Sequence, residues 1–161
     1  MKRDRKNRVN WSIIITSLIL ALALAGCGGL LGLEESPVED FEYVYDADTQ
    51  GVMITYYMDT DTKVVIPRMI EGEPVTSISG VVLSRIEFYG AFEDSGIMSV
   101  HIPDTVKVID MSAFEGCTGL TSVTIPDSVT AIGYRAFWDC DNLPEETRQK
   151  IQDIDSRAFA E

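Results

Sequence analysis

The apolar positions in the second half of this chain recur with a fixed period. Residues 97–117 (IMSVHIPDTVKVIDMSAFEGC) and 120–140 (LTSVTIPDSVTAIGYRAFWDC) match when residue 97 is laid on residue 120, a shift of 23. The matching positions hold a valine–x–isoleucine triplet with Pro-Asp after it, then two further apolar sites, an Ala-Phe pair and a cysteine. A period of about 20–30 residues with apolar sites at constant offsets is typical of a repeat solenoid, in which each repeat forms one coil of a continuous stack.

An expanded copy, residues 64–92, precedes the two regular ones. It keeps the order of the motifs but has 9 positions from Ile66 to Val75, where the regular copies have 4 between the corresponding sites. A longer insertion, residues 79–90, lies between the apolar sites Val75 and Ile78 and the Ala-Phe pair at residues 91–92. The Ala-Phe pair occurs once more at residues 158–159. The sequence therefore predicts two regular coils, one expanded coil and a partial one at the end.

Each valine–x–isoleucine triplet is predicted to form a short strand whose two flanking residues point into the stack. The proline after it ends the strand, because proline lacks the backbone N–H that a strand ladder needs. A single coil buries too few apolar side chains to offset the entropy of ordering its backbone, so coils are stable only when they stack on neighbours. Stacking places the phenylalanines of the Ala-Phe pairs above one another as a core column. These are Phe92, Phe114, Phe137 and Phe159.

Both ends of the stack need a cap, since an open end exposes apolar core and unpaired strand edges. At the N-terminal end, aromatic residues alternate with other residues over positions 41–45, as is typical of a strand. A turn of sequence DADTQG follows, and residues 52–57 are again rich in strand formers. We predict a β-hairpin there, within a cap of residues 41–62, whose aromatic face covers the first coil. At the other end, Pro144 with two glutamates and strong helix formers after it predicts a short capping helix.

The string IPDSVTAIGYRAFWDC at residues 125–140 resembles the repeat unit of the BspA-type bacterial leucine-rich repeat. The resemblance extends over about residues 59–161, with departures at Asp110, where the family has glycine, and at Ser95, where it has cysteine. It implies a curved right-handed solenoid on a secreted or cell-surface bacterial protein that is used for adhesion and partner binding. The expected fold is thus a short leucine-rich repeat array, mainly β, in a domain of residues 63–161 that includes the helical cap.

Residues 1–26 have the features of a lipoprotein signal peptide, with five basic residues before an apolar stretch. The sequence Leu-Ala-Gly-Cys that ends at Cys27 resembles the lipobox of bacterial lipoproteins. This implies a lipid on the Cys27 thiol and a location at the bacterial cell surface, on the outer face of the membrane. Residues 27–40 are expected to be a flexible tether. The alternative is an uncleaved anchor helix over residues 11–33, a stretch of 23 residues without a charge.

The charge of the chain excludes one class of function. Without the first 26 residues, 8 basic residues remain against 25 acidic ones, a net charge of −17. A surface of this sign repels the phosphates of nucleic acids, so we expect no nucleic-acid partner.

Few side chains suggest catalysis or metal binding. His101 is the single histidine, and it occupies an outward strand position without a visible partner. Cys117 and Cys140 occupy the same site in adjacent coils, so they should lie about 5 Å apart, either as free thiols or as a disulfide. Asp104 and Asp127 also share a site, and we interpret them as turn residues that accept bonds from backbone amides.

The remaining motifs are equally weak. The turn Asp46–Gly51 has the spacing of a calcium-binding loop, but an EF-hand needs a bidentate glutamate at its twelfth position, which is Tyr57 here. The sequence has no phosphate-binding glycine loop, nucleophile motif or zinc signature. We therefore expect no enzyme activity, no metal and no cofactor.

Binding of a protein partner is the first hypothesis, because outward residues of stacked strands form the concave face of leucine-rich repeats. A second candidate surface is the insertion at residues 79–90, since long additions to a regular repeat often carry function. Two other classes stay open: a passive structural envelope lipoprotein, and an accessory subunit of an enzyme. No small-molecule substrate is expected. The outward residues are Lys63, Val65, Met98, Ser99, His101, Thr121, Ser122 and Thr124.

Overall fold

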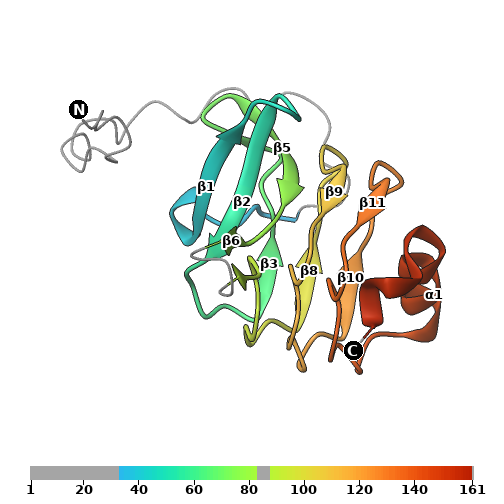
Figure 1. Cartoon of the computed structure of the whole chain (residues 1–161). Coiled ribbons are helices and arrows are strands. Elements are labelled where there is room, and N and C mark those ends of the chain that lie inside the picture. Colours follow the sequence, from blue (N-terminus) through green and yellow to red (C-terminus); the bar gives the residue numbers. More distant parts are fainter. Residues whose placement is uncertain (1–32, 83–87, 161) are drawn as a thin grey trace, which may run out of the picture. The chain divides into compact units, whose positions relative to one another are not determined.

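The computed structural model describes residues 33–82 and 88–160, which form a stack of short strands closed by a helix at the C-terminal end (Figure 1). The N-terminal strands are β1 (Phe41–Asp46), β2 (Gly51–Tyr57), β3 (Lys63–Val65), β4 (Met69–Ile70), β5 (Glu73–Ile78) and β6 (Val81–Val82). The later strands are β7 (Phe88–Tyr89), β8 (Ser99–His101), β9 (Val108–Ile109), β10 (Ser122–Thr124) and β11 (Ala131–Ile132). The helices are α1 (Glu145–Ile154) and the 3-10 turns η1 (Val38–Asp40) and η2 (Ser156–Phe159).

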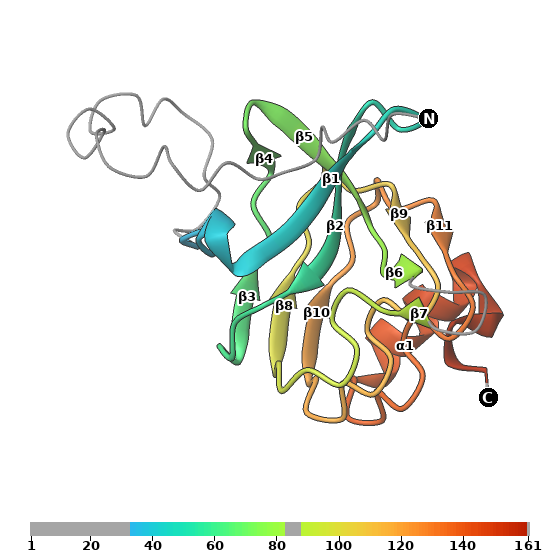
Figure 2. The same cartoon turned by 60° about the vertical axis from the view of Figure 1, so that its left-hand side comes forward.

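Two parallel ladders run through the coils and confirm the predicted repeat array. In the first, β3, β8 and β10 lie side by side (Figure 2), with Val64, Val100 and Val123 in register. In the second, β5, β9 and β11 pair with Ile78, Ile109 and Ile132 in register. All six of these side chains are buried. The two regular copies and the expanded copy therefore form successive coils of one stack.

The aromatic column is present as predicted. The ring centroids of Phe92 and Phe114 are 4.9 Å apart at an interplanar angle of 14°, and those of Phe114 and Phe137 are 5.1 Å apart at 12°. Phe159 closes the column more loosely, 6.1 Å from Phe137 at 36°. Parallel rings at this distance follow from the spacing between paired strands, which is about 4.8 Å.

The hairpin of β1 and β2 continues the second ladder, which the sequence had not indicated. β2 pairs in parallel with β5, with Ile54 opposite Ile78. The N–H of Tyr57 donates to the carbonyl of Ala91 in the next coil. The N–H of Phe92 makes the equivalent bond to the carbonyl of Ala113, one coil further on. Tyr57 therefore takes the place of the coil phenylalanine, and its ring stacks 5.2 Å from that of Phe92. Burial, together with nearby acidic residues, raises the pKa of Tyr57 to about 12.

The aromatic face of the hairpin covers the first coil only in part. Phe41 is 3% exposed and its ring lies 5.5 Å from that of Tyr57, so this end of the hairpin belongs to the core. Tyr45, near the turn, is 60% exposed. The predicted aromatic cover is therefore present at the Phe41 end of the hairpin and does not include Tyr45.

The part of the expected tether that the structure describes, from Leu33 on, contacts the first coil. The N–H of Ser36 donates to the carbonyl of Val65 at 2.8 Å, and the N–H of Val65 donates to Ser36 Oγ at 3.0 Å. The N–H of Arg68 donates to Glu35 Oε1 at 3.1 Å. The two bonds of Ser36 satisfy backbone groups of β3 that would otherwise form an unpaired sheet edge.

The C-terminal helix α1 closes the far end of the stack, as predicted. Ile151 is fully buried, and Leu143, before the helix, is 5% exposed. The guanidinium of Arg148 lies 4.2 Å over the ring of Phe159 and donates to the carbonyl of Cys140 at 3.1 Å. In this way α1 and η2 cover the core of the last coil, but they pair with no strand.

Candidate functional site

The strands β3, β8 and β10 bring six of the eight predicted outward residues together in two rows. Lys63, Ser99 and Ser122 form one row across the three strands. Val65, His101 and Thr124 form a second row. Met98 and Thr121 directly precede the first row, and Thr121 Oγ1 donates to the carbonyl of Met98 at 3.1 Å. We call these eight residues the outward face.

The outward face is accessible and nearly neutral. Met98 is 49% exposed, and Lys63, Thr121, Ser122 and Thr124 are also exposed. The other three side chains are half-buried. Hydroxyl groups and short apolar groups predominate, a composition suited to protein contact rather than to binding of a charged ligand.

The geometry around His101 favours a surface role for this residue. In its row, His101 lies between Val65 and Thr124, neither of which is a carboxylate or a second metal ligand of the usual kind. A general base needs a partner that orients it and a metal site needs several ligands. Over residues 33–82 and 88–160, no group of three histidine, cysteine or acidic side chains is placed to hold a metal ion.

The two stacked aspartates form ion pairs at the surface. The hydrogen bonds from backbone amides that we had expected for them do not occur among the described residues. Asp104 pairs with Arg68 of the preceding coil, and Asp127 pairs with Lys150 of α1 at 2.9 Å. The hydrogen bond and the charge of Lys150 lower the pKa of Asp127. Because all four side chains are largely exposed, these pairs contribute little to stability.

Cys117 and Cys140 are free, buried thiols. Each donates to the phenylalanine carbonyl of the preceding coil, Cys117 to Phe92 at 3.0 Å and Cys140 to Phe114 at 3.1 Å. The neighbouring sulfur of Cys117, and then burial, raise the pKa of Cys140. The hydrogen bond with Cys140 lowers the pKa of Cys117. Because both thiols are buried and each donates to a backbone carbonyl, they pack as small core residues of the stack.

The contacts of the Asp46–Gly51 turn give Asp46 a structural role. Asp46 accepts bonds from Thr49 Oγ1 at 2.8 Å and from the N–H of Asp48 at 3.0 Å, and these bonds lower its pKa. The carboxylate that would begin a calcium loop is therefore used to close the hairpin turn.

The insertion at residues 79–90 is described only in part. Its ends form an antiparallel pair, in which Val81 lies opposite Tyr89 and Val82 opposite Phe88. Cys27, the predicted lipidation site, and most of the alternative anchor segment lie outside the described residues. In the part of the chain that the structure covers, no helix has the length and apolar character needed to span a bilayer.

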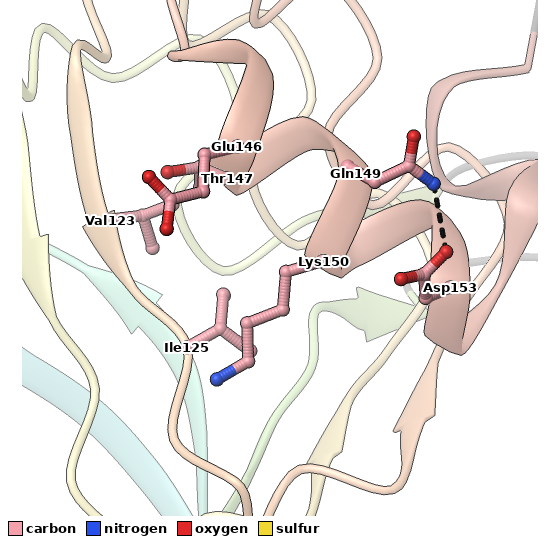
Figure 3. Close-up of a pocket in the computed structure, with 7 residues that line it drawn as sticks. All are labelled: Val123, Ile125, Glu146, Thr147, Gln149, Lys150 and Asp153. Atoms are coloured by element: carbon pink, nitrogen blue, oxygen red, sulfur yellow. Dashed lines mark hydrogen bonds between the residues drawn. The ribbon is translucent and has the colours of Figure 1, made fainter.

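A cleft between β10 and α1 was not predicted from the sequence. It has a volume of about 420 Å³, and Figure 3 shows apolar side chains from the strand facing polar ones from the helix. The lining residues are Val123, Ile125, Glu146, Thr147, Gln149, Lys150 and Asp153. The sequence signal for this cleft is the helix that replaces a further strand after residue 143. A helix cannot pair with the edge of a strand, so space is left between β10 and α1.

Comparison with known proteins supports the repeat assignment. The family model described as "BspA type Leucine rich repeat region (6 copies)" matches residues 86–161. The solved T. pallidum leucine-rich repeat protein is 31% identical, with a TM-score of 0.60 over 68% of this chain and 48% of that one. A search of curated protein sequences returned no match.

Two further solved structures are similar. A leucine-rich cell surface protein from Faecalibacterium prausnitzii is 29% identical, with a TM-score of 0.50 over 70% of this chain and 30% of that one. A leucine-rich repeat protein from Bacteroides capillosus is 27% identical, with a TM-score of 0.53 over 67% of this chain and 77% of that one. The chain thus spans about half the length of the T. pallidum protein and under a third of the F. prausnitzii protein.

Proposed function

We propose that this chain is a cell-surface lipoprotein that binds a protein partner through its outward face; the match of residues 86–161 to the BspA-type leucine-rich repeat model supports this proposal. The observation that carries the proposal is the register of β3, β8 and β10. It aligns six of the eight side chains in two rows across three separate segments, with Met98 and Thr121 directly before the rows, and no catalytic constellation is among them. Surfaces of this kind act through shape and hydrogen bonding rather than through chemistry.

The proposed location rests on two observations. The sequence Leu-Ala-Gly-Cys before residue 28 follows a basic and then an apolar segment, the order found in lipoprotein signal peptides. A solved relative, the F. prausnitzii protein, is described as a cell surface protein. A lipid on Cys27 would hold the repeat array at the outer face of the bacterial membrane, where its partner is an envelope or host protein.

The size of the outward face limits the expected affinity. Three strands about 4.8 Å apart, with three residues each, give a sheet only about 10 Å across. A standard protein interface buries about 800 Å² on each partner, which this surface alone does not reach. We therefore propose a weak or transient contact unless neighbouring surfaces contribute.

The proposal is tested by replacing Met98, His101 and Thr124 with alanine in one variant. We expect the amount of partner protein that co-purifies from cross-linked intact cells to fall by about tenfold or more. Three central interface residues that each contribute somewhat under 1 kcal/mol would give this loss. Quantitative mass spectrometry of the co-purified protein is the measurement.

The matched control replaces Met111, Lys107 and Thr130 with alanine, since these are accessible side chains outside the outward face. It should retain the partner. Equal loss in both variants would contradict the proposal, and loss only on deletion of residues 79–90 would transfer the function to the insertion. A purified chain with hydrolase or redox turnover would favour the enzyme class, and absence of any specific partner would favour a passive envelope protein.

A further inference from the structure

The last strand of the first ladder, β10, has an edge without a strand partner. The N–H of Ser122 donates to the carbonyl of Met98, so the backbone groups of Ser122 point toward β8. Successive backbone groups of a strand point to opposite sides, so the N–H and carbonyl of Val123 point away from β8. The sheet order ends at β10, and these groups therefore face the cleft with α1.

The opposite edge of the same sheet shows how such groups are normally satisfied in this molecule. On β3, Val65 is the residue whose backbone groups point outward, and both are bonded by Ser36. Among residues 33–82 and 88–160, no hydrogen bond of this kind reaches the outer side of Val123 or the N–H of Ile125. Unpaired N–H and carbonyl groups along a strand edge are a template for another strand.

The cleft is large enough and suitably lined for a peptide segment. Its volume of about 420 Å³ lies within the range of about 300–1,000 Å³ that is usual for ligand sites. Val123 and Ile125 give it an apolar wall, and the two residues are 8% and 5% exposed. In Figure 3, the polar wall comes entirely from α1.

The charges of the polar wall favour a cation. Glu146 and Asp153 both line the cleft, and only Asp153 has a hydrogen bond, from Gln149 Nε2 at 2.8 Å. The one basic residue of the wall, Lys150, is engaged by Asp127. Glu146, Asp153 and Lys150 together give the wall a net charge of −1, with the carboxylate of Asp127 beside Lys150, on a chain whose net charge is −13.

We propose that this cleft binds an extended, basic polypeptide segment of a partner protein, which adds to β10 as a further strand. Its backbone would pair with the outward groups of Val123 and Ile125, and its lysine or arginine side chains would face Glu146 and Asp153. Strand addition supplies affinity through main-chain bonds, and the alternating side chains supply selectivity. This is a second binding site, at the end of the array, and it does not depend on the outward face.

The test is an NMR titration of the ¹⁵N-labelled full-length chain with a capped pentapeptide of alternating lysine and valine. We expect the largest amide shift changes at Val123 and Ile125. Glu146→Lys should weaken binding about fivefold, because it removes one attraction and adds one repulsion of about 0.5 kcal/mol each. The matched control is Glu145→Lys, which makes the same charge change in the same helical turn at a residue that does not line the cleft.

Each outcome supports or overturns the inference. A pentapeptide with every backbone nitrogen methylated should not bind, since it cannot donate to the strand edge. Equal binding of the methylated peptide, or equal weakening by the two lysine variants, would show nonspecific charge attraction and overturn the proposal. Shift changes confined to Val65, His101 and Thr124 would overturn it while leaving the outward face supported. No binding at all would also overturn it, provided that circular dichroism shows the variants folded.

Discussion

Replacing Phe114 with alanine should lower the free energy of unfolding by about 3–5 kcal/mol, the range for loss of a fully buried phenylalanine. Phe114 is inaccessible to solvent, and its ring stacks on both sides, 4.9 Å from Phe92 and 5.1 Å from Phe137. Its removal leaves a cavity between two coils and breaks both stacking contacts. Because a small domain is stable by only about 5–15 kcal/mol, much of the variant should be unfolded at mild denaturant concentrations. Urea unfolding followed by circular dichroism measures the change.

Two control variants separate the column from a general effect of losing an aromatic ring. Phe159→Ala removes the last and least buried ring of the column, which has one phenylalanine neighbour at 6.1 Å, and should cost clearly less. Phe114→Leu keeps most of the volume and should also cost less than the alanine variant. Equal destabilisation by Phe114→Ala and Phe159→Ala would show that the rings do not form one continuous core.

Replacing Cys27 with alanine should move nearly all of the protein out of the membrane fraction. Alanine has no thiol to accept a lipid, and two or more acyl chains are what make such an anchor durable. Membrane fractionation of intact cells, with mass spectrometry of the N-terminal peptide, is the measurement. In the unsubstituted protein, the proposal expects that peptide to begin at residue 27 and to carry the lipid mass.

Cys140→Ala is the matched control, since Cys140 is buried in the last coil and should not affect retention in the membrane. Retention of the Cys27→Ala variant in the membrane would contradict the lipid anchor. It would favour the uncleaved anchor helix over residues 11–33 instead.

The parts of the fold that could be predicted from sequence are those that repeat. Ile109 and Ile132, or Phe114 and Phe137, occupy identical positions in neighbouring coils, so one alignment places them in register. The six residues of the outward face that lie in the strands could be predicted for the same reason, because the strand parity that buries Val100 and Val123 turns His101 and Thr124 to the other side. Met98 and Thr121 precede the strands and do not follow from this parity.

The features that could not be predicted lie where the repeat ends. Tyr57 takes the place of the coil phenylalanine, but an extended strand precedes it instead of the usual coil sequence, so no alignment finds it. Both hydrogen bonds to the outer edge of Val65 come from one residue, Ser36. A single residue outside the repeats produces no periodic pattern in the sequence. The cleft beside β10 exists because α1 covers the core of the last coil and not its strand edge, a matter of how two elements pack rather than of either sequence alone.

The most direct test of the stacked-coil account is proton NOE spectroscopy of the rings of Phe92, Phe114 and Phe137. The structure predicts NOEs from the Phe114 ring to both other rings, whose centroids lie 4.9 and 5.1 Å away, and none between Phe92 and Phe137. Absence of either Phe114 contact, or a direct contact between Phe92 and Phe137, would show that the coils do not stack in this order. The outward face would then not exist as described.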